Sequence, residues 1–162
     1  RYLDDAPETK PADGEGVVVS EMGEGKFLNQ VVAGAHRFLM DEPISVGGYN
    51  AGPNPYDLLA AALGGCTSMT MRMYAEHKGI PLERVEVAVR HATTHCEDCE
   101  AAATGATPKI DEWTRVLHID GDITDDQRAG LVRIADRCPV HLTLERSSIV
   151  VTEVADDGGV NR

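Results

Sequence analysis

The stretch GPNPYDLLAAALGGCTSMTMRMYAEHKG, residues 52–79, predicts a long helix that is apolar on nearly every side. Asn54 is a good N-cap, Pro55 suits the first helical position, and Gly79 marks the end of the pattern. A helix that is apolar all round must be buried, so it needs cover from a sheet and from something else. In a chain of this size, a second subunit is one candidate for that additional cover.

Shorter segments around this helix alternate apolar and polar residues, as half-buried strands do. The predicted strands comprise residues 16–20, 26–33, 36–40, 82–91, 112–123 and 147–154. A second helix is predicted from Thr124, which forms a capping box with Gln127, through Cys138 to a stop at Pro139. An antiparallel meander, further strands and two buried helices together predict an α+β fold.

The composition favours one globular domain, because 42% of the 162 residues are hydrophobic and 26% are charged. We expect a polar tail over residues 1–15, a single domain over 16–155 and a second polar tail over 156–162. Residues 92–111 are too many for a tight hairpin, and we predict that they form an inserted loop.

The charge of the chain excludes two classes of partner. The formal net charge is −12, with no basic stripe, so phosphate backbones and anionic membranes would be repelled. The longest apolar run is too short to cross a bilayer, and the first residues lack the pattern of a signal peptide. We therefore expect a cytoplasmic protein whose cysteines are reduced at rest.

Cys66 and Cys138 both fall on apolar helix faces, where a cysteine serves either packing or chemistry. Cys66 lies far beyond the helix N-terminus, and Cys138 is expected at a helix C-terminus, where the dipole opposes a thiolate. Neither thiol would be activated by its own helix. His141, three residues after Cys138, is either a hydrogen-bonded structural residue, a proton donor or a cation that tunes a thiol, and it is also a candidate substrate contact.

The residues around Cys66 are compatible with a site for an apolar substrate. Met69, Thr70 and Met73 share its helix face and would supply a mostly apolar lining. Gly64 and Gly65 lower the helix propensity immediately before it. The glycine pair indicates either close packing against another element or an open path to the sulfur.

The predicted loop and the strand before it carry the sequence HATTHCEDC, with His91, His95, Cys96 and Cys99. These four side chains are of types that zinc accepts, so a structural zinc site is one interpretation. The others are a surface loop without special chemistry and a local disulfide. A thioredoxin-like role is not expected, because the neighbouring carboxylates would raise the thiol pKa values.

The segments GPNPYDLLAAALGGCTSMTMRMYA and RIADRCPVHLTLE together resemble the OsmC/Ohr family (osmotically inducible protein C and organic hydroperoxide resistance protein) over roughly residues 25–155. The resemblance implies antiparallel sheets that wrap two buried central helices in an intertwined homodimer, with active sites at the interface. It also implies that Cys66 attacks a hydroperoxide and that Cys138 resolves the product as a disulfide. A dithiol, for example a lipoyl group, would then reduce the disulfide, and no cofactor is required.

One position departs from the family pattern. Hydroperoxide reductases of this family typically carry Glu where this chain has Tyr56, and that Glu orients an activating Arg. Glu42 is a candidate for the missing carboxylate and Arg37 for the cation, while Tyr56 would contact substrate. We thus expect an organic hydroperoxide reductase that acts in oxidative stress defence. The alternatives are a module that binds an apolar ligand or senses redox state, and a metal-dependent role.

Overall fold

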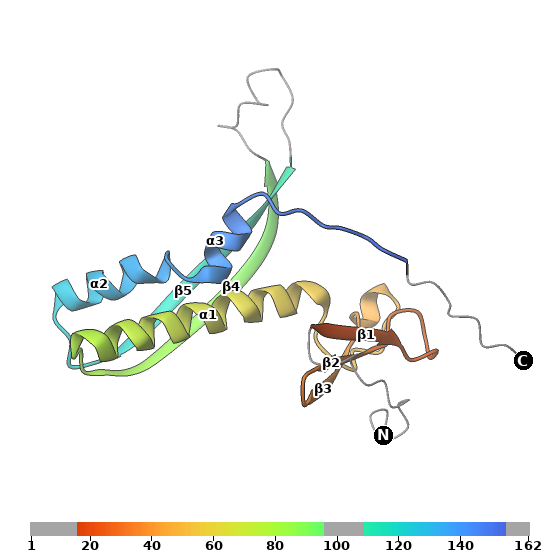
Figure 1. Cartoon of the computed structure of the whole chain (residues 1–162), viewed down its shortest axis with the longest axis horizontal. Coiled ribbons are helices and arrows are strands. Elements are labelled where there is room, and N and C mark those ends of the chain that lie inside the picture. The colour runs from red at the N-terminus through yellow and green to blue at the C-terminus, as the bar shows by residue number, and fades with distance from the viewer. Residues whose placement is uncertain (1–15, 96–108, 155–162) are drawn as a thin grey trace, which may run out of the picture. The chain divides into compact units, whose positions relative to one another are not determined.

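The computed structural model describes residues 16–95 and 109–154, and the chain divides into two compact units. The first unit comprises Arg1–Gly65 and Val87–Leu117, and the second comprises Cys66–Glu86 and His118–Arg162. The elements that contribute to both units are α1 (Pro55–Lys78), β4 (Leu82–His95) and β5 (Lys109–Gly121) (Figure 1). No helix in the described residues is long and apolar enough to cross a membrane.

The first unit begins with an antiparallel sheet of order β1-β2-β3, as the sequence predicts. Its strands are β1 (Val17–Glu21), β2 (Asn29–Ala33) and β3 (His36–Met40). Val31 in the central strand lies opposite Val19 on one side and Phe38 on the other. Val31, Val32 and the preceding Leu28 are buried, so the central strand supplies the core of this sheet.

Helix α1 has the bounds that its terminal residues predict. The Asn54 Oδ1 accepts a hydrogen bond from the Asp57 backbone N–H at 3.0 Å, and the Asp57 carboxylate accepts one from the Asn54 N–H at 3.1 Å. At the other end, Gly79 adopts φ +63°, and its N–H donates to the carbonyl of Glu76. The left-handed conformation favours glycine and ends the helix.

The two glycines before Cys66 have different surroundings. A Cβ on Gly64 would lie 3.3 Å from Cγ2 of Val89, so this glycine allows α1 to pack closely on β4. A Cβ on Gly65 would meet nothing within 4 Å. Close packing thus explains Gly64, and only Gly65 faces open space.

Strands β4 and β5 form a two-stranded sheet and are longer than predicted (Figure 1). β4 continues to His95 and β5 begins at Lys109, so both ends of the predicted loop over residues 92–111 are strand. The predicted alternation is present at the start of β4, where Val85 and Val87 are half-buried and Glu86 is exposed.

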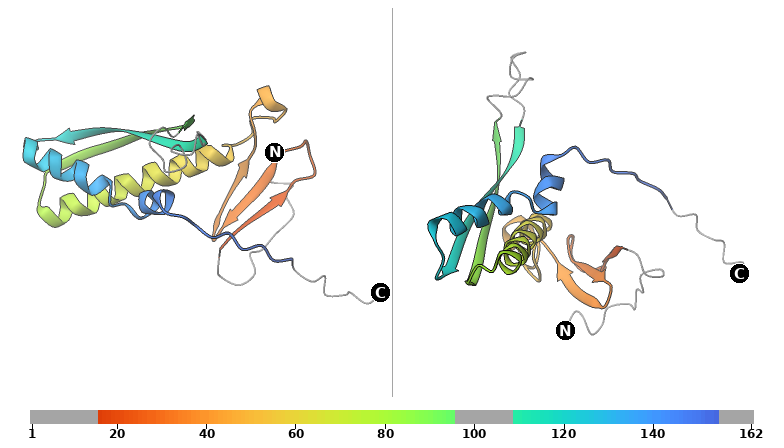
Figure 2. Two further views of the ribbon diagram at one scale, coloured as in Figure 1. Left: turned by 90° about the horizontal axis from the view of Figure 1, so that it is seen from above. Right: turned by 60° about the vertical axis from the view of Figure 1, so that its left-hand side comes forward.

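In the second unit, α2 (Asp125–Ala135) lies alongside the later turns of α1 (Figures 1 and 2). The predicted capping box is present, because Thr124 Oγ1 accepts from the Gln127 N–H and Gln127 Oε1 accepts from the Thr124 N–H. Leu131 of α2 and Met71 of α1 are fully buried and form the core of this unit.

The predicted end of the second helix is wrong. α2 stops at Ala135, and a new helix, α3 (Pro139–Glu145), begins with Pro139 at its first position and Cys138 as its N-cap. Proline has no N–H and its fixed φ suits a first helical turn, so the residue that was expected to stop one helix starts the next.

The strand predicted for residues 147–154 is absent from the described chain, in which this segment has no regular structure. Its apolar side chains Ile149, Val150, Val151 and Val154 are between 76% and 92% exposed. A strand requires a partner for its backbone hydrogen bonds, and no described strand pairs with this segment.

The buried carboxylate of Asp41 organises the loop between β3 and α1, which contains the 3₁₀ helix η1 (Ile44–Val46). It accepts hydrogen bonds from the backbone N–H groups of Glu42 and Tyr49, both at 2.8 Å, and of Ala51 at 3.2 Å. Burial acts to raise the pKa of Asp41, but these three hydrogen bonds outweigh it and hold the pKa below its ordinary value.

We expect Asp41→Asn to lower the free energy of unfolding by about 1–3 kcal/mol at neutral pH, because the amide would direct N–H groups at backbone donors. The lowered pKa stabilises the fold where the carboxyl is ionised, and this contribution is lost as the pH falls through the folded-state pKa. Urea denaturation should therefore show that the difference in free energy of unfolding between wild type and variant becomes smaller below about pH 4. The exposed Asp122→Asn is the matched control; an equal loss in both variants would contradict the role of Asp41.

Candidate active site

Cys138 is fully buried and is the N-cap of α3. Its Sγ accepts a hydrogen bond from the backbone N–H of His141 at 3.3 Å. The expectation that the preceding helix dipole opposes a thiolate here is wrong, because Cys138 lies at the start of α3 and not at the end of α2.

The side chain of Thr67 links this thiol to α1. Thr67 Oγ1 lies 3.6 Å from Cys138 Sγ, and both residues are fully buried. Cys66 immediately precedes Thr67, so the second unit places the Cys138 sulfur against the neighbour of Cys66. Both cysteines are free thiols. Sequence reasoning missed Thr67, although its position beside Cys66 was an available signal.

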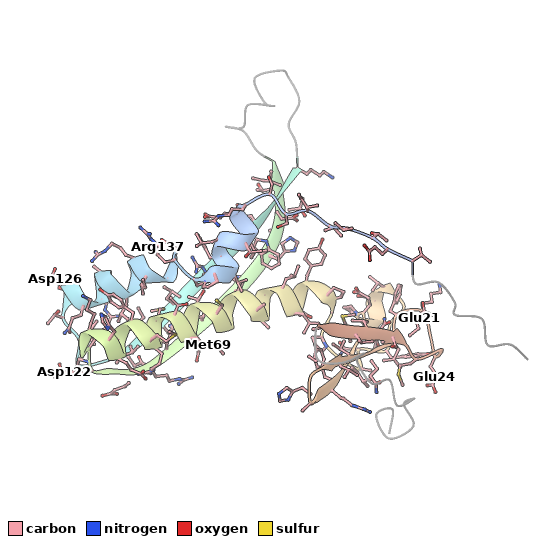
Figure 3. The ribbon with its side chains drawn as sticks, viewed as in Figure 1. Glu21, Glu24, Met69, Asp122, Asp126 and Arg137 are labelled. Atoms are coloured by element: carbon pink, nitrogen blue, oxygen red, sulfur yellow. The ribbon has the colours of Figure 1, made fainter. Side chains whose placement is uncertain are left out.

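Cys66 is half-buried, at the border of an exposed apolar face of α1. Met69 and Met73, one and two turns further along, are 69% and 70% exposed. Figure 3 shows Met69 on the side of α1 that points away from α2. A reactive thiol must be reached by its substrate, and the partial exposure of Cys66 meets this requirement whereas the burial of Cys138 does not.

Two of the three predicted lining residues border one hollow of about 390 Å³ on this part of the molecule. The hollow is lined by Thr70, Met73, Tyr74, Ile134 and Pro139. Thr70 follows Cys66 by four residues, a rise of about 6 Å along the same helix face. Met69, the third predicted residue, does not line the hollow.

His141 contacts Cys138 through its backbone, while its imidazole faces Glu145. Its Nε2 lies 3.1 Å from Glu145 Oε2, one turn further along α3. His141 thus contacts Cys138 through its backbone N–H and Glu145 through its ring.

A separate cluster in the first unit contains Tyr56 and His91. The rings of Tyr56 and His91, which is on β4, stack with their centroids 4.4 Å apart. The ring centroid of Trp113, on β5, also lies 4.4 Å from that of His91. His91 Nε2 lies 2.8 Å from Asp111 Oδ1. Sequence reasoning missed Trp113 and Asp111 as partners of these residues, because the pairing of two strands across a long connection is not a local property.

The two proposed activating residues also lie in the first unit. Arg37 is exposed on β3, and Glu42 is half-buried after it. Glu42 borders a small hollow of about 130 Å³, together with Lys26, Phe27, Asn29, Met40, Asp41 and Pro55. Both residues belong to a different unit from Cys66 and Cys138.

Most of the predicted zinc set falls outside the described part of the chain. Cys96, Cys99 and the side chain of His95 are not described, whereas His91 has one ring nitrogen paired with Asp111. Within the described residues, no group of three or more candidate ligand side chains could hold a metal ion. The zinc site therefore stays a prediction.

The family model described as OsmC-like protein matches residues 48–154, which include α1, Cys66, Cys138 and α3. The chain belongs to the OsmC-like family. This confirms the resemblance of the two cysteine-bearing segments, and no curated protein matches the chain closely enough to add a more specific relative.

Solved structures confirm the OsmC-like α+β fold. An organic hydroperoxide resistance protein OsmC from Legionella pneumophila is 20% identical with a TM-score of 0.56, over 83% of this chain and 91% of that one. An OsmC like protein from Mycoplasma pneumoniae is 17% identical with a TM-score of 0.58, over 83% and 89%. An organic hydroperoxide resistance protein from Elizabethkingia anophelis is 19% identical with a TM-score of 0.58, over 83% and 90%. At these identities the likeness establishes the fold alone.

Proposed function

We propose that this OsmC-like protein is a cysteine-dependent peroxidase that reduces organic hydroperoxides in the cytoplasm, with Cys66 as the attacking residue and Cys138 as the resolving residue. The observation that carries the proposal is the contact between Cys138 Sγ and Thr67, the neighbour of Cys66. The difference in exposure supports the division of roles, because the accessible thiol meets the substrate and the buried thiol acts second.

The proposed cycle has three steps. The Cys66 thiolate attacks the hydroperoxide, the O–O bond breaks, and the products are the Cys66 sulfenic acid and, after protonation, an alcohol. The Cys138 thiol then condenses with the sulfenic acid, forming an S–S bond and releasing water. A dithiol, for example a lipoyl group, reduces this disulfide by exchange and becomes a disulfide itself. No metal or organic cofactor enters this cycle.

The residues that activate Cys66 form a second part of the proposal. Arg37 is proposed as the cation and Glu42 as the carboxylate that orients it, with Tyr56 in contact with substrate. Tyr56 cannot take the charged role of a Glu at its position, and its ring stacks on His91. The rate of Cys66 alkylation at several pH values, compared between wild type, Arg37→Gln and Glu42→Gln, tests this assignment.

The resolving role is tested with Cys138→Ser. We expect this variant to consume the first equivalent of cumene hydroperoxide at the wild-type rate and to accumulate a Cys66 sulfenic acid that dimedone traps. Turnover supported by dihydrolipoamide should fall, because the disulfide that this dithiol reduces does not form. Thr143→Ser on α3 is the control, since Thr143 is exposed and bonds only to the turn of its own helix in the described structure. Wild-type turnover in Cys138→Ser would remove the resolving role.

We also propose that the protein is a homodimer with its active sites at the interface. The exposed methionines on α1 support this, since they border Cys66 and a second copy would bury them. The exposed apolar residues of segment 147–154 support it as well, because their strand pattern lacks a partner in one described chain.

Sedimentation equilibrium should give twice the mass of 17.4 kDa for the wild type. The double variant Met69→Glu, Met73→Glu should shift this equilibrium toward monomer, because it places two charged side chains among the apolar residues at the core of the proposed interface. Glu76→Gln, one helix turn further on, is the control. A wild type that is monomeric at micromolar concentration would contradict the dimer.

A further inference from the structure

The start of α3 lies beside the middle of α1 (Figure 1), and the Cys138 sulfur occupies this junction. Within the described chain, this sulfur has two polar contacts. The backbone N–H of His141 donates a hydrogen bond to it at 3.3 Å, and the Thr67 Oγ1 lies 3.6 Å from it. One contact is therefore a fixed donor, whereas the other is a hydroxyl that can donate or accept.

Burial keeps bulk water away from the contact between hydroxyl and thiol. Thr67 and Cys138 are both 0% exposed. The condensation step of the proposed cycle nevertheless requires a proton to move. Cys138 has to lose the proton of its thiol, and the oxygen on Cys66 has to gain a proton to leave as water. A buried side chain that both accepts and donates a proton would meet this requirement.

The hydroxyl of Thr67 has the position that this transfer needs. The His141 N–H bonds to the sulfur as a donor, so it cannot accept the thiol proton. Consecutive helix residues point in directions about 100° apart, so the sulfur that lies against Thr67 has to turn toward Cys66 when the disulfide forms. Thr67 therefore adjoins both the position of the sulfur before the reaction and the residue that the sulfur attacks.

We propose that Thr67 is a catalytic residue that relays a proton in the resolving step; this inference rests on the proposed peroxidase cycle. As the S–S bond forms, the Cys138 S–H bond breaks and its proton passes to the Thr67 Oγ1. The hydroxyl gives its own proton to the oxygen of the Cys66 sulfenic acid, the S–O bond breaks, and water leaves. The sulfenic sulfur is reduced, the thiol sulfur is oxidised, and Thr67 is a hydroxyl again at the end.

A single turnover of the full chain tests the relay. Reduced protein is mixed with one equivalent of cumene hydroperoxide, and samples are quenched in acid and weighed by mass spectrometry. The sulfenic acid adds about 16 Da and the disulfide removes about 2 Da, so the two steps are followed separately. Thr67→Val keeps the shape of the side chain without the hydroxyl. We expect this variant to form the sulfenic acid at the wild-type rate and the disulfide about 100-fold more slowly.

Three further variants accompany this measurement. Thr67→Ser keeps the hydroxyl and should restore most of the rate of disulfide formation. Ser68→Ala removes the hydroxyl of the next residue on α1, which is half-buried, and should match the wild type. Thr67→Ala is a second variant without the hydroxyl and should share the defect of Thr67→Val. Circular dichroism checks that each variant is folded.

The pH dependence separates a proton relay from a contact that only supports packing. The ionised share of a thiol rises with pH, and a thiolate has no proton to pass on. The rate difference between Thr67→Val and the wild type should therefore become smaller above about pH 9.

Two results would overturn the relay and leave the proposed cycle intact. One is disulfide formation at the wild-type rate in Thr67→Val and Thr67→Ala. The other is a defect of equal size at every pH, because it would indicate a loss of packing. Absence of the disulfide between Cys66 and Cys138 in the wild type would instead contradict the proposed function, and the relay with it.

Discussion

Replacement of Cys66 by serine is expected to lower dithiol-dependent reduction of cumene hydroperoxide by at least about 1,000-fold, as removal of an enzyme's nucleophile does. A serine hydroxyl is not ionised near neutral pH and does not form the sulfenic acid on which the later steps depend. The measurement is steady-state consumption of hydroperoxide with dihydrolipoamide as reductant.

The structure provides a control on the same helix. Ser68 is half-buried two residues after Cys66, and Ser68→Ala should retain wild-type turnover. Both variants should unfold at the wild-type denaturant concentration. In Cys66→Ser, the sulfur-to-oxygen change at a half-buried position leaves the packing of α1 in place. Wild-type turnover in Cys66→Ser would contradict the proposed role of Cys66, whatever the turnover of Ser68→Ala.

The second large effect concerns Gly52, in the loop that leads into α1. A Cβ at this position would overlap the backbone carbonyl of Leu39 on β3. This neighbour is main chain and cannot rotate away, and the loop is held there by the hydrogen bond from the Asp41 N–H to the Pro53 carbonyl at 3.2 Å. Gly52→Ala should therefore lower the free energy of unfolding by about 3 kcal/mol or more in urea denaturation.

Gly65→Ala is the matched comparison, because its Cβ would enter open space in the middle of α1. Alanine has a higher helix propensity than glycine, so the free energy of unfolding of this variant should rise by about 0.5–1 kcal/mol. Replacement of glycine by alanine is thus expected to lower the free energy of unfolding at Gly52 and to raise it at Gly65. A Gly52→Ala variant as stable as the wild type would show that the loop does not pack on β3 in this way.

Sequence reasoning predicted the parts of the fold that depend on neighbouring residues. The ends of α1 follow from Asn54, Pro55 and Gly79, and the start of α2 follows from its capping box. The strand alternation and the pair of cysteines were also readable, because each depends on spacing along the chain. The family match over residues 48–154 confirms the family resemblance that these segments carry.

The features that sequence reasoning missed depend on residues far apart in the chain. Pro139 fits both the end of one helix and the start of another, and only the folded chain shows the second. Segment 147–154 has a strand pattern, but a pattern does not supply a pairing partner. The contact of Thr67 with Cys138 joins residues 71 positions apart. The position of Thr67 beside Cys66 was a local signal for the residue, but nothing local indicates its partner.

The central claim is that Cys66 and Cys138 form one redox pair, and mass spectrometry tests it most directly. Reduced protein treated with one equivalent of cumene hydroperoxide should lose about 2 Da, and peptide mapping should place the new disulfide between Cys66 and Cys138. An unchanged mass with both thiols still open to alkylation would contradict the claim. So would a disulfide formed only between Cys96 and Cys99.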